Sequence, residues 1–140
     1  MNIRFWTLFA TMQCWATEPA NLEVAVKDER RSNCQVYLAV YRDPRTWLSE
    51  KPFRFEKGEM KAGAGTVQVM NLPPGKYAIL AYCDKNGNGE LDENLLGIPK
   101  EPYGFSNGKP GKYELRFAEA AFEVSPNATK SRQEITLLSP

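Results

Sequence analysis

The stretch NLPPGKYAILAYC, residues 71–83, decides the fold class of this chain. Its first five residues predict a tight turn, because proline fixes φ and Gly75 permits a positive φ. Residues 76–83 then carry apolar side chains on both faces of an extended chain, which is typical of a central, well-buried strand. Because no helical period of any length accompanies this strand, the stretch predicts an all-β domain.

Further short strands are expected on both sides of this stretch. They are predicted at residues 22–26, 36–41, 53–55, 66–70, 122–124 and 135–138. Single helical turns are expected within 45–52 and 116–121, and a Gly/Ala-rich connection at 58–65. Residues 84–112 contain no periodic run long enough to form an element. About seven short strands joined by turns predict a single two-sheet antiparallel sandwich, immunoglobulin-like or transthyretin-like, with one long ordered loop.

Composition and charge exclude several classes of protein. The chain has 140 residues, 42% of them hydrophobic, which fits one globular domain and is too apolar for a disordered one. Eighteen basic and 17 acidic residues give a net charge of +1 and form no nucleic-acid-binding pattern. Past residue 20 no apolar run exceeds a few residues, so no membrane span is expected.

The first 16 residues are typical of a signal peptide. Arg4 supplies a basic start, residues 5–15 are mostly apolar, and Cys14-Trp15-Ala16 places small residues at positions −3 and −1 of a cleavage site. The prediction is therefore a signal peptide at 1–16, a β-sandwich domain at 17–140 and a periplasmic or secreted location. The alternative is that this segment forms a buried N-terminal helix or strand.

Two cysteines remain beyond the predicted signal peptide. Cys34 opens one expected strand and Cys83 closes another, so neighbouring antiparallel strands can bring them together. In an exported chain such a pair suggests a disulfide. Two buried free thiols are the alternative, because the sequence does not reveal the Cβ geometry that a bridge requires.

The segment DKNGNGELD, residues 84–92, has the spacing of a calcium-binding loop. Oxygen-bearing side chains stand at positions 1, 3, 5 and 9, a glycine stands at position 6, and the carbonyl of position 7 adds a ligand. The predicted metal ligands are Asp84, Asn86, Asn88, the carbonyl of Glu90, and Asp92. Position 12 is Leu95 instead of glutamate, and a strand rather than a helix precedes the loop. Affinity for calcium is therefore expected at about 10⁻⁴–10⁻³ M. A metal-free turn is the alternative, since Asn and Asp also bond to their own backbone.

The second half of the loop holds a candidate ligand surface. Its residues are Glu101, Tyr103, Phe105, Ser106 and Asn107. In one interpretation the two aromatic rings stack on a sugar or peptide and the polar side chains hydrogen-bond to it. In the other, which is favoured, the rings pin the loop against the edge of the sandwich, because aromatic side chains bury large areas and long loops need anchors.

Several catalytic devices are missing from the sequence. The absence of histidine removes the commonest general base and the Ser-His-Asp triad. Neither a Gly-rich phosphate loop nor a Gly-x-Ser-x-Gly elbow is present. We therefore predict that the protein is not an enzyme. A small hydrolase using carboxylates such as Asp92 and Glu101 is the least favoured alternative.

Taken together, several of these segments resemble one bacterial family, catalogued as domain of unknown function 2141. The segments are NLPPGKYA (71–78), DKNGNGELD (84–92), LGIPKE (96–101), YGFSN (103–107) and FAEAAF (117–122). The resemblance covers about residues 20–138 and implies an exported β-sandwich of Gram-negative bacteria, with no reaction attached. Relatives carry histidine immediately before the first Asp of the loop, where this chain has Cys83.

Two hypotheses of function follow. The first is a binding module whose calcium-ordered loop contacts an envelope protein, a peptide or a glycan. The second is a structural or accessory envelope domain that binds no metal. The first expects partial exposure of Tyr103, Phe105 and Asn107, and the second expects their burial.

Overall fold

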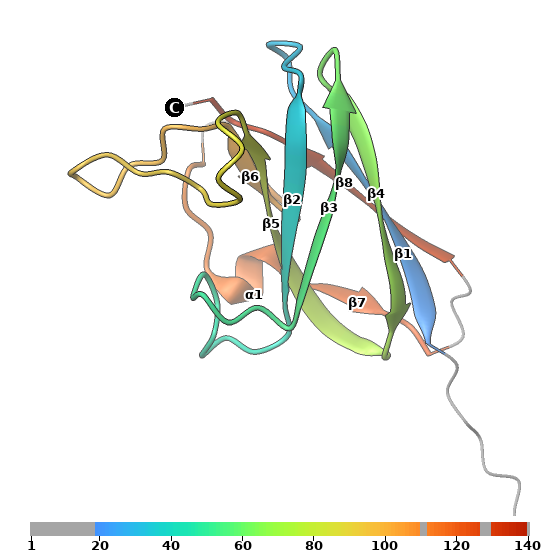
Figure 1. Ribbon diagram of the computed structural model, residues 1–140. Coiled ribbons are helices and arrows are strands. Elements are labelled where there is room, and N and C mark those ends of the chain that lie inside the picture. Colours follow the sequence, from blue (N-terminus) through green and yellow to red (C-terminus); the bar gives the residue numbers. More distant parts are fainter. Residues whose placement is uncertain (1–18, 110–111, 127–129, 140) are drawn as a thin grey trace, which may run out of the picture.

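The strands form one nearly closed, barrel-like sheet in the computed structural model, which describes residues 19–109, 112–126 and 130–139 (Figure 1). The elements are β1 (Ala20–Lys27), β2 (Cys34–Tyr41), β3 (Arg54–Lys61), β4 (Ala64–Leu72), β5 (Gly75–Asp84), β6 (Tyr103–Phe105), α1 (Phe117–Ala120), β7 (Phe122–Val124) and β8 (Lys130–Thr136). The all-β prediction is thereby confirmed, and so is the short helical turn after residue 116. The signal peptide expected at 1–16 lies outside the described residues. Within those residues no helix is both long and apolar enough to cross a membrane.

The strand order is β6-β5-β2-β3-β4-β1-β8, and β7 pairs with the beginning of β5. Neighbours along this order are antiparallel except β1 and β8, which are parallel. Two backbone hydrogen bonds between Tyr103 and Leu138, of 3.0 and 2.7 Å, link β6 to the residue stretch that follows β8. Pairing is therefore continuous around the molecule, and the two separate sheets expected from the sequence are not clearly divided.

The interior of the barrel is one apolar core. It is built from alternate residues of the strands, as the period of two in each strand requires. Its largest fully buried side chains include Tyr77, Leu22, Leu38, Met60, Leu72, Ile79 and Ile135. Burying a side chain of this size stabilises the fold by about 1.5–3 kcal/mol, so this core is a main source of the favourable free energy of folding.

A second apolar cluster covers the outer face of β2, β5 and β6. Tyr41, Tyr82 and Phe105 belong to it, together with Leu115 and Phe117 from the segment that follows β6. The Trp47 indole packs there as well and donates a hydrogen bond of 2.8 Å to the Leu115 carbonyl. Because this cluster lies opposite the barrel interior, β5 is buried on both faces, which confirms the prediction for residues 76–83.

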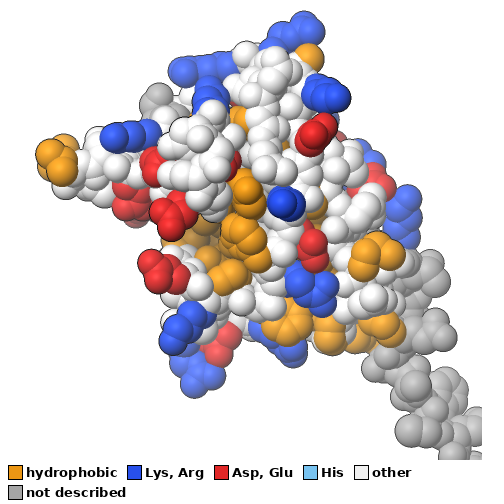
Figure 2. Space-filling view, viewed as in Figure 1, with side chains coloured by type: hydrophobic (Ala, Val, Ile, Leu, Met, Phe, Trp, Pro, Cys, Tyr) orange, Lys and Arg blue, Asp and Glu red, His pale blue; other side chains and the backbone are white. Residues whose placement is uncertain are grey.

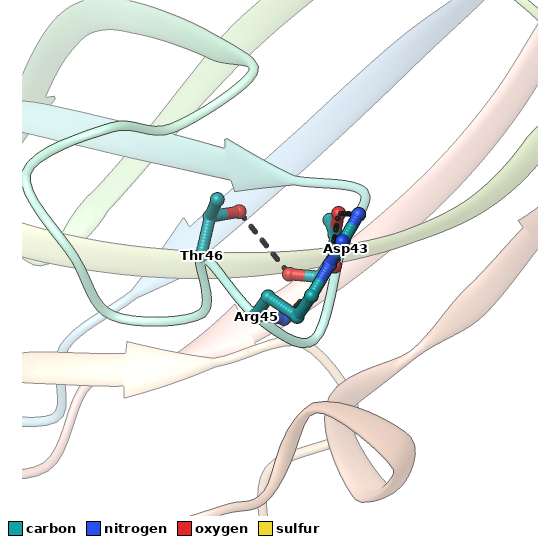
Figure 3. A network of polar contacts seen from close by, with 3 residues as sticks. All are labelled: Asp43, Arg45 and Thr46. Carbon is teal, nitrogen blue, oxygen red and sulfur yellow. Dashed lines mark hydrogen bonds and ion pairs between the residues drawn. The ribbon is translucent and has the colours of Figure 1, made fainter.

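The chain leaves β2 through a turn organised by Asp43 (Figure 3). The Asp43 carboxylate accepts hydrogen bonds from the backbone and the guanidinium of Arg45, and the Thr46 hydroxyl donates to the Asp43 carbonyl. Successive turns follow instead of the single helical turn expected within 45–52. They direct Trp47 into the outer cluster.

The connection expected at residues 58–65 is largely strand. β3 continues to Lys61, and the tight turn consists of Ala62 and Gly63, both with positive φ. Gly58 and Gly65 serve the close approach of β3 and β4, not a loop. A Cβ on Gly65 would lie 2.7 Å from the Glu59 carbonyl oxygen. A strand was likewise missed at β6, inside the region for which no element was predicted.

Candidate functional site

The loop between β5 and β6 projects from the barrel, as Figure 1 shows. Three contacts fix its base. The Tyr82 hydroxyl donates a hydrogen bond of 2.7 Å to the Gly89 carbonyl, and the Cys83 N–H donates to the Pro102 carbonyl at 2.9 Å. Leu91 packs against the outer apolar cluster. The loop is thus attached to the barrel on both sides of residues 84–92.

Asp84 is buried and organises the first turn of the loop. One carboxylate oxygen accepts the N–H of Gly87 at 3.0 Å and the other accepts the N–H of Gly89 at 2.8 Å. Both glycines have a φ near +75°, which costs glycine little and other residues more. Asp84 at position 1 and Gly89 at position 6 therefore act together, with the carboxylate as the acceptor.

The predicted ligands Asn86, Asn88 and Asp92 meet at one place. The side-chain amides of Asn86 and Asn88 each donate to the Asp92 carboxylate, the second over 2.7 Å. Their amide oxygens accept backbone N–H groups two residues further on, from Asn88 and Glu90. These are Asx turns, the arrangement expected of a metal-free loop. The Glu90 side chain is exposed and takes no part.

The oxygen-bearing side chains of the loop base are of the kind that binds a hard cation, but their oxygen atoms are not oriented to bind one. In the described ranges, no three His, Cys, Asp or Glu side chains gather where they could hold a metal ion. A cation would therefore rely on amide and carbonyl oxygens beside Asp92. Asn86 and Asn88 would have to turn their oxygens toward it and give up their Asx turns. Since each carboxylate oxygen has two lone pairs, Asp84 can accept its amides and still face a cation.

Glu101 closes the loop from its far end. Its side chain is buried, and its two oxygens accept the N–H of Lys85 at 2.9 Å and the N–H of Asp92 at 3.3 Å. One carboxylate thus holds both ends of the nine-residue segment. The sequence assigned Glu101 to a ligand surface, whereas the structure makes it part of the loop's own framework.

The remaining residues predicted as a ligand surface are placed mostly inward. Tyr103 is 6% exposed, Phe105 5% and Ser106 0%. The Tyr103 hydroxyl donates to the Tyr113 carbonyl, and the Ser106 hydroxyl donates to the Ala120 carbonyl. In this conformation the two rings cannot stack on a ligand, and they pin the chain as the favoured interpretation expected. Asn107 is exposed, but its amide donates to the carbonyl of Ala121 at 2.8 Å.

The tip of the loop carries a feature that the sequence reasoning did not find. We call residues 94–99 the loop apex. Leu95, Leu96 and Ile98 are 106%, 83% and 51% exposed, and Figure 2 shows hydrophobic side chains at the outer end of this projection. The available signal was a Leu-Leu pair between an Asp/Asn/Gly-rich segment and a Gly-Ile-Pro turn.

The phenol of Tyr82 stays protonated at the loop base. Burial raises its pKa far above the usual range, and the nearby Tyr37, Asp84 and Glu101 raise the pKa further. A protonated phenol keeps its hydrogen for the Gly89 carbonyl. This contact is therefore independent of pH throughout the physiological range.

Cys34 and Cys83 lie with their sulfur atoms 2.05 Å apart, a bonded distance. The disulfide joins the start of β2 to β5, one residue before Asp84. It therefore ties the base of the loop covalently to the neighbouring strand. The structure contains this bridge and not the two free thiols of the alternative.

These features define a class: a small barrel-like β domain that presents one ordered, projecting loop with an apolar tip. The family model described as uncharacterized protein conserved in bacteria (DUF2141) matches residues 24–132. The chain belongs to that family, which confirms the resemblance found in the sequence. None of the curated proteins and none of the solved structures matches it.

Proposed function

We propose that the chain is an exported, non-catalytic binding module. Its projecting loop, residues 84–100, makes the contact, and calcium orders the base of that loop at residues 84–92. The exposed apolar apex carries this proposal. Large apolar side chains that an ordered segment holds away from the rest of the protein mark interaction sites more often than scattered surface residues do.

The order of the loop supports a role in binding. Asp84 and Glu101 hold the base through four backbone N–H groups, and Asn94 holds the apex in a hairpin. A loop already fixed in one conformation loses little conformational entropy when it binds. Candidate partners remain an envelope protein, a peptide or a glycan, with the apex as the element that touches them.

The finer fold and the location belong to the same proposal. We infer a transthyretin-like or immunoglobulin-like sandwich, because within the described chain β3 and β4 pair at just two positions and β6 meets the end of β8 at one bridge. In this proposal these two weakly paired places are the boundaries between the two sheets. The Cys34–Cys83 disulfide favours an oxidising compartment, hence a periplasmic or secreted protein.

A structural or accessory envelope domain without metal is the second candidate. Two observations favour it. Tyr103 and Phe105 are buried, as that hypothesis expects. The Asp92 carboxylate already has two amide donors, so the loop closes without a cation.

A calcium titration distinguishes the two candidates. The chelator-treated protein is expected to melt at a higher temperature in millimolar calcium than in magnesium. With a dissociation constant of about 10⁻⁴ M, 10 mM calcium adds roughly 2.7 kcal/mol to the free energy of unfolding. Asp92→Asn keeps the size of the side chain and removes its charge, so the rise is expected to disappear in this variant.

Glu123→Gln is the matched control, since Glu123 is an exposed acid on β7, which pairs with the start of β5, at the end of that strand opposite to the loop. It is expected to keep the full calcium response. An unchanged melting temperature in 10 mM calcium, or an equal rise with magnesium, would reject calcium ordering and leave the metal-free domain.

A further inference from the structure

We propose that the loop apex, residues 94–99, inserts into the interfacial layer of a zwitterionic phospholipid bilayer. The inference rests on the proposed function, because it concerns the same projecting loop, and it puts a lipid surface in place of the protein, peptide or glycan considered there. It starts from the apolar character of the apex. Residues 94–99 contain no charged side chain, their three aliphatic side chains are half to fully exposed, and Figure 2 shows hydrophobic side chains at the outer end of the projection.

Three backbone N–H groups of the apex are already paired within the loop. The N–H groups of Leu96 and Ile98 both donate to the Asn94 side-chain oxygen, at 2.9 and 3.0 Å. The Gly97 N–H donates to the Asn94 carbonyl at 3.0 Å, and Pro99 has no N–H. Entry into the interfacial layer therefore leaves these three N–H groups paired, which lowers the cost of taking them out of water.

The charges that flank the apex suit the headgroup layer. Glu93 forms an antiparallel bridge with Pro99, and the Lys100 N–H donates to the Asp92 carbonyl, so Asp92, Glu93 and Lys100 stand just below the apex. Charged groups of both signs at this level can pair with the ammonium and phosphate groups of a zwitterionic lipid. The apex beyond them is short, which fits the roughly 5–10 Å depth of interfacial insertion.

The residue types favour lipid over a pocket in another protein. The energetic anchors of protein–protein interfaces are enriched in Trp, Tyr and Arg, and Leu is under-represented among them. The apex has none of those three residues. Its aliphatic side chains form a convex surface. The N–H groups of Leu96, Gly97 and Ile98 are already bonded within the loop. Such a surface is suited to partition into a layer rather than to specific pairing.

Vesicle flotation of the full chain tests the proposal. Vesicles of phosphatidylcholine and phosphatidylethanolamine are expected to carry the protein upward, with little dependence on salt because the net charge is small. The double variant Leu95→Ser/Leu96→Ser is expected to reduce the partition coefficient roughly tenfold or more, since two leucine side chains no longer leave water. Met70→Ser, which removes a half-exposed apolar side chain on β4, outside the loop, is the control and should change little.

A depth measurement separates the apex from the apolar residues 5–15 of the full chain. In Leu95→Trp, lipids with brominated acyl chains are expected to quench the additional fluorescence relative to the unsubstituted protein. Equal flotation of the double variant and the control, or no additional quenching, would overturn the proposal. Absence of vesicle binding would also overturn it and point to a protein partner, whereas the calcium titration would still decide the function of the loop base.

Discussion

At the scale of single residues, Glu101 joins the two ends of the segment 84–92 to each other. Its two oxygens accept N–H groups that lie seven residues apart, on Lys85 and Asp92. A buried carboxylate with two backbone donors satisfies all three groups at once. Removing either acceptor leaves a part-buried N–H without its partner beside a buried side chain, which is the costly form of a lost hydrogen bond.

Glu101→Gln is therefore expected to lower the free energy of unfolding by about 1–3 kcal/mol. The glutamine amide keeps one acceptor and places its own NH₂ group against the second N–H. Denaturant unfolding measures the loss, and amide exchange at Lys85 and Asp92 locates it.

Glu93→Gln is the matched control, because Glu93 is exposed on the same loop. It should stay within about 0.5 kcal/mol of the parent protein. Equal stabilities for the two variants would show that Glu101 does not hold the loop.

At the scale of elements, the short helix α1 depends on one acidic side chain. The Lys112 ammonium hydrogen-bonds to Glu119, and the Arg116 N–H donates to the same carboxylate at 2.9 Å. These contacts lower the pKa of Glu119 from 4.5 to about 2. Because the folded pKa lies below the unfolded one, the stabilisation is present above about pH 4.5 and is lost as pH falls toward 2.

Lys112→Ala is expected to move the pKa of Glu119 back toward its ordinary value. The pH range over which acid removes the stabilisation from Glu119 is then expected to become narrower. Carboxyl titration by NMR measures the shift. Lys109→Ala, on an exposed neighbour, should leave the pKa of Glu119 near 2. A pKa unaffected by the loss of Lys112 would contradict the assignment of cause.

Elements whose signal is local were predictable, and those defined by distant contacts were not. Residues 76–83 reveal their double burial in their own apolar pattern. Judged from the neighbouring sequence alone, Gly58 and Gly65 indicate a loop. In the structure they instead allow two strands to approach closely. The burial of Tyr103 and Phe105 depends on a cover from residues 113–121, which has no period that would predict it.

The candidate site was predictable in part for the same reason. The spacing of Asp84, Asn86, Asn88 and Asp92 located the loop base, because turn chemistry is encoded within a few residues. The exposure of Leu95 and Leu96 was not predictable. A pair of leucines in a sequence indicates burial unless the fold shows that nothing covers them.

At the scale of the whole molecule, closure of the barrel requires close contact between β6 and the end of β8. Gly104 makes that contact possible, since a Cβ there would lie 2.5 Å from the Thr136 carbonyl oxygen. The two backbone hydrogen bonds between Tyr103 and Leu138 lie next to it. Neither strand can yield easily, because both sides of the contact are backbone.

Gly104→Ala is therefore expected to cost about 1–3 kcal/mol of stability and to accelerate amide exchange at Tyr103 and Leu138. Thermal unfolding and hydrogen exchange measure the two effects. Normal exchange at both amides would mean that closure does not depend on this glycine.

The parallel pairing of β1 with β8 also sets the order in which the chain can fold. Asn21 pairs with Lys130, so the first and last strands meet across most of the sequence. β1 can join β4 once residue 72 is available, but its other edge stays open until residue 130 arrives. Because contacts between residues so distant in sequence form slowly, a chain that emerges N-terminus first exposes an unpaired β1 edge until β8 has emerged. Pairing with β8 then ends the exposure of that edge to aggregation.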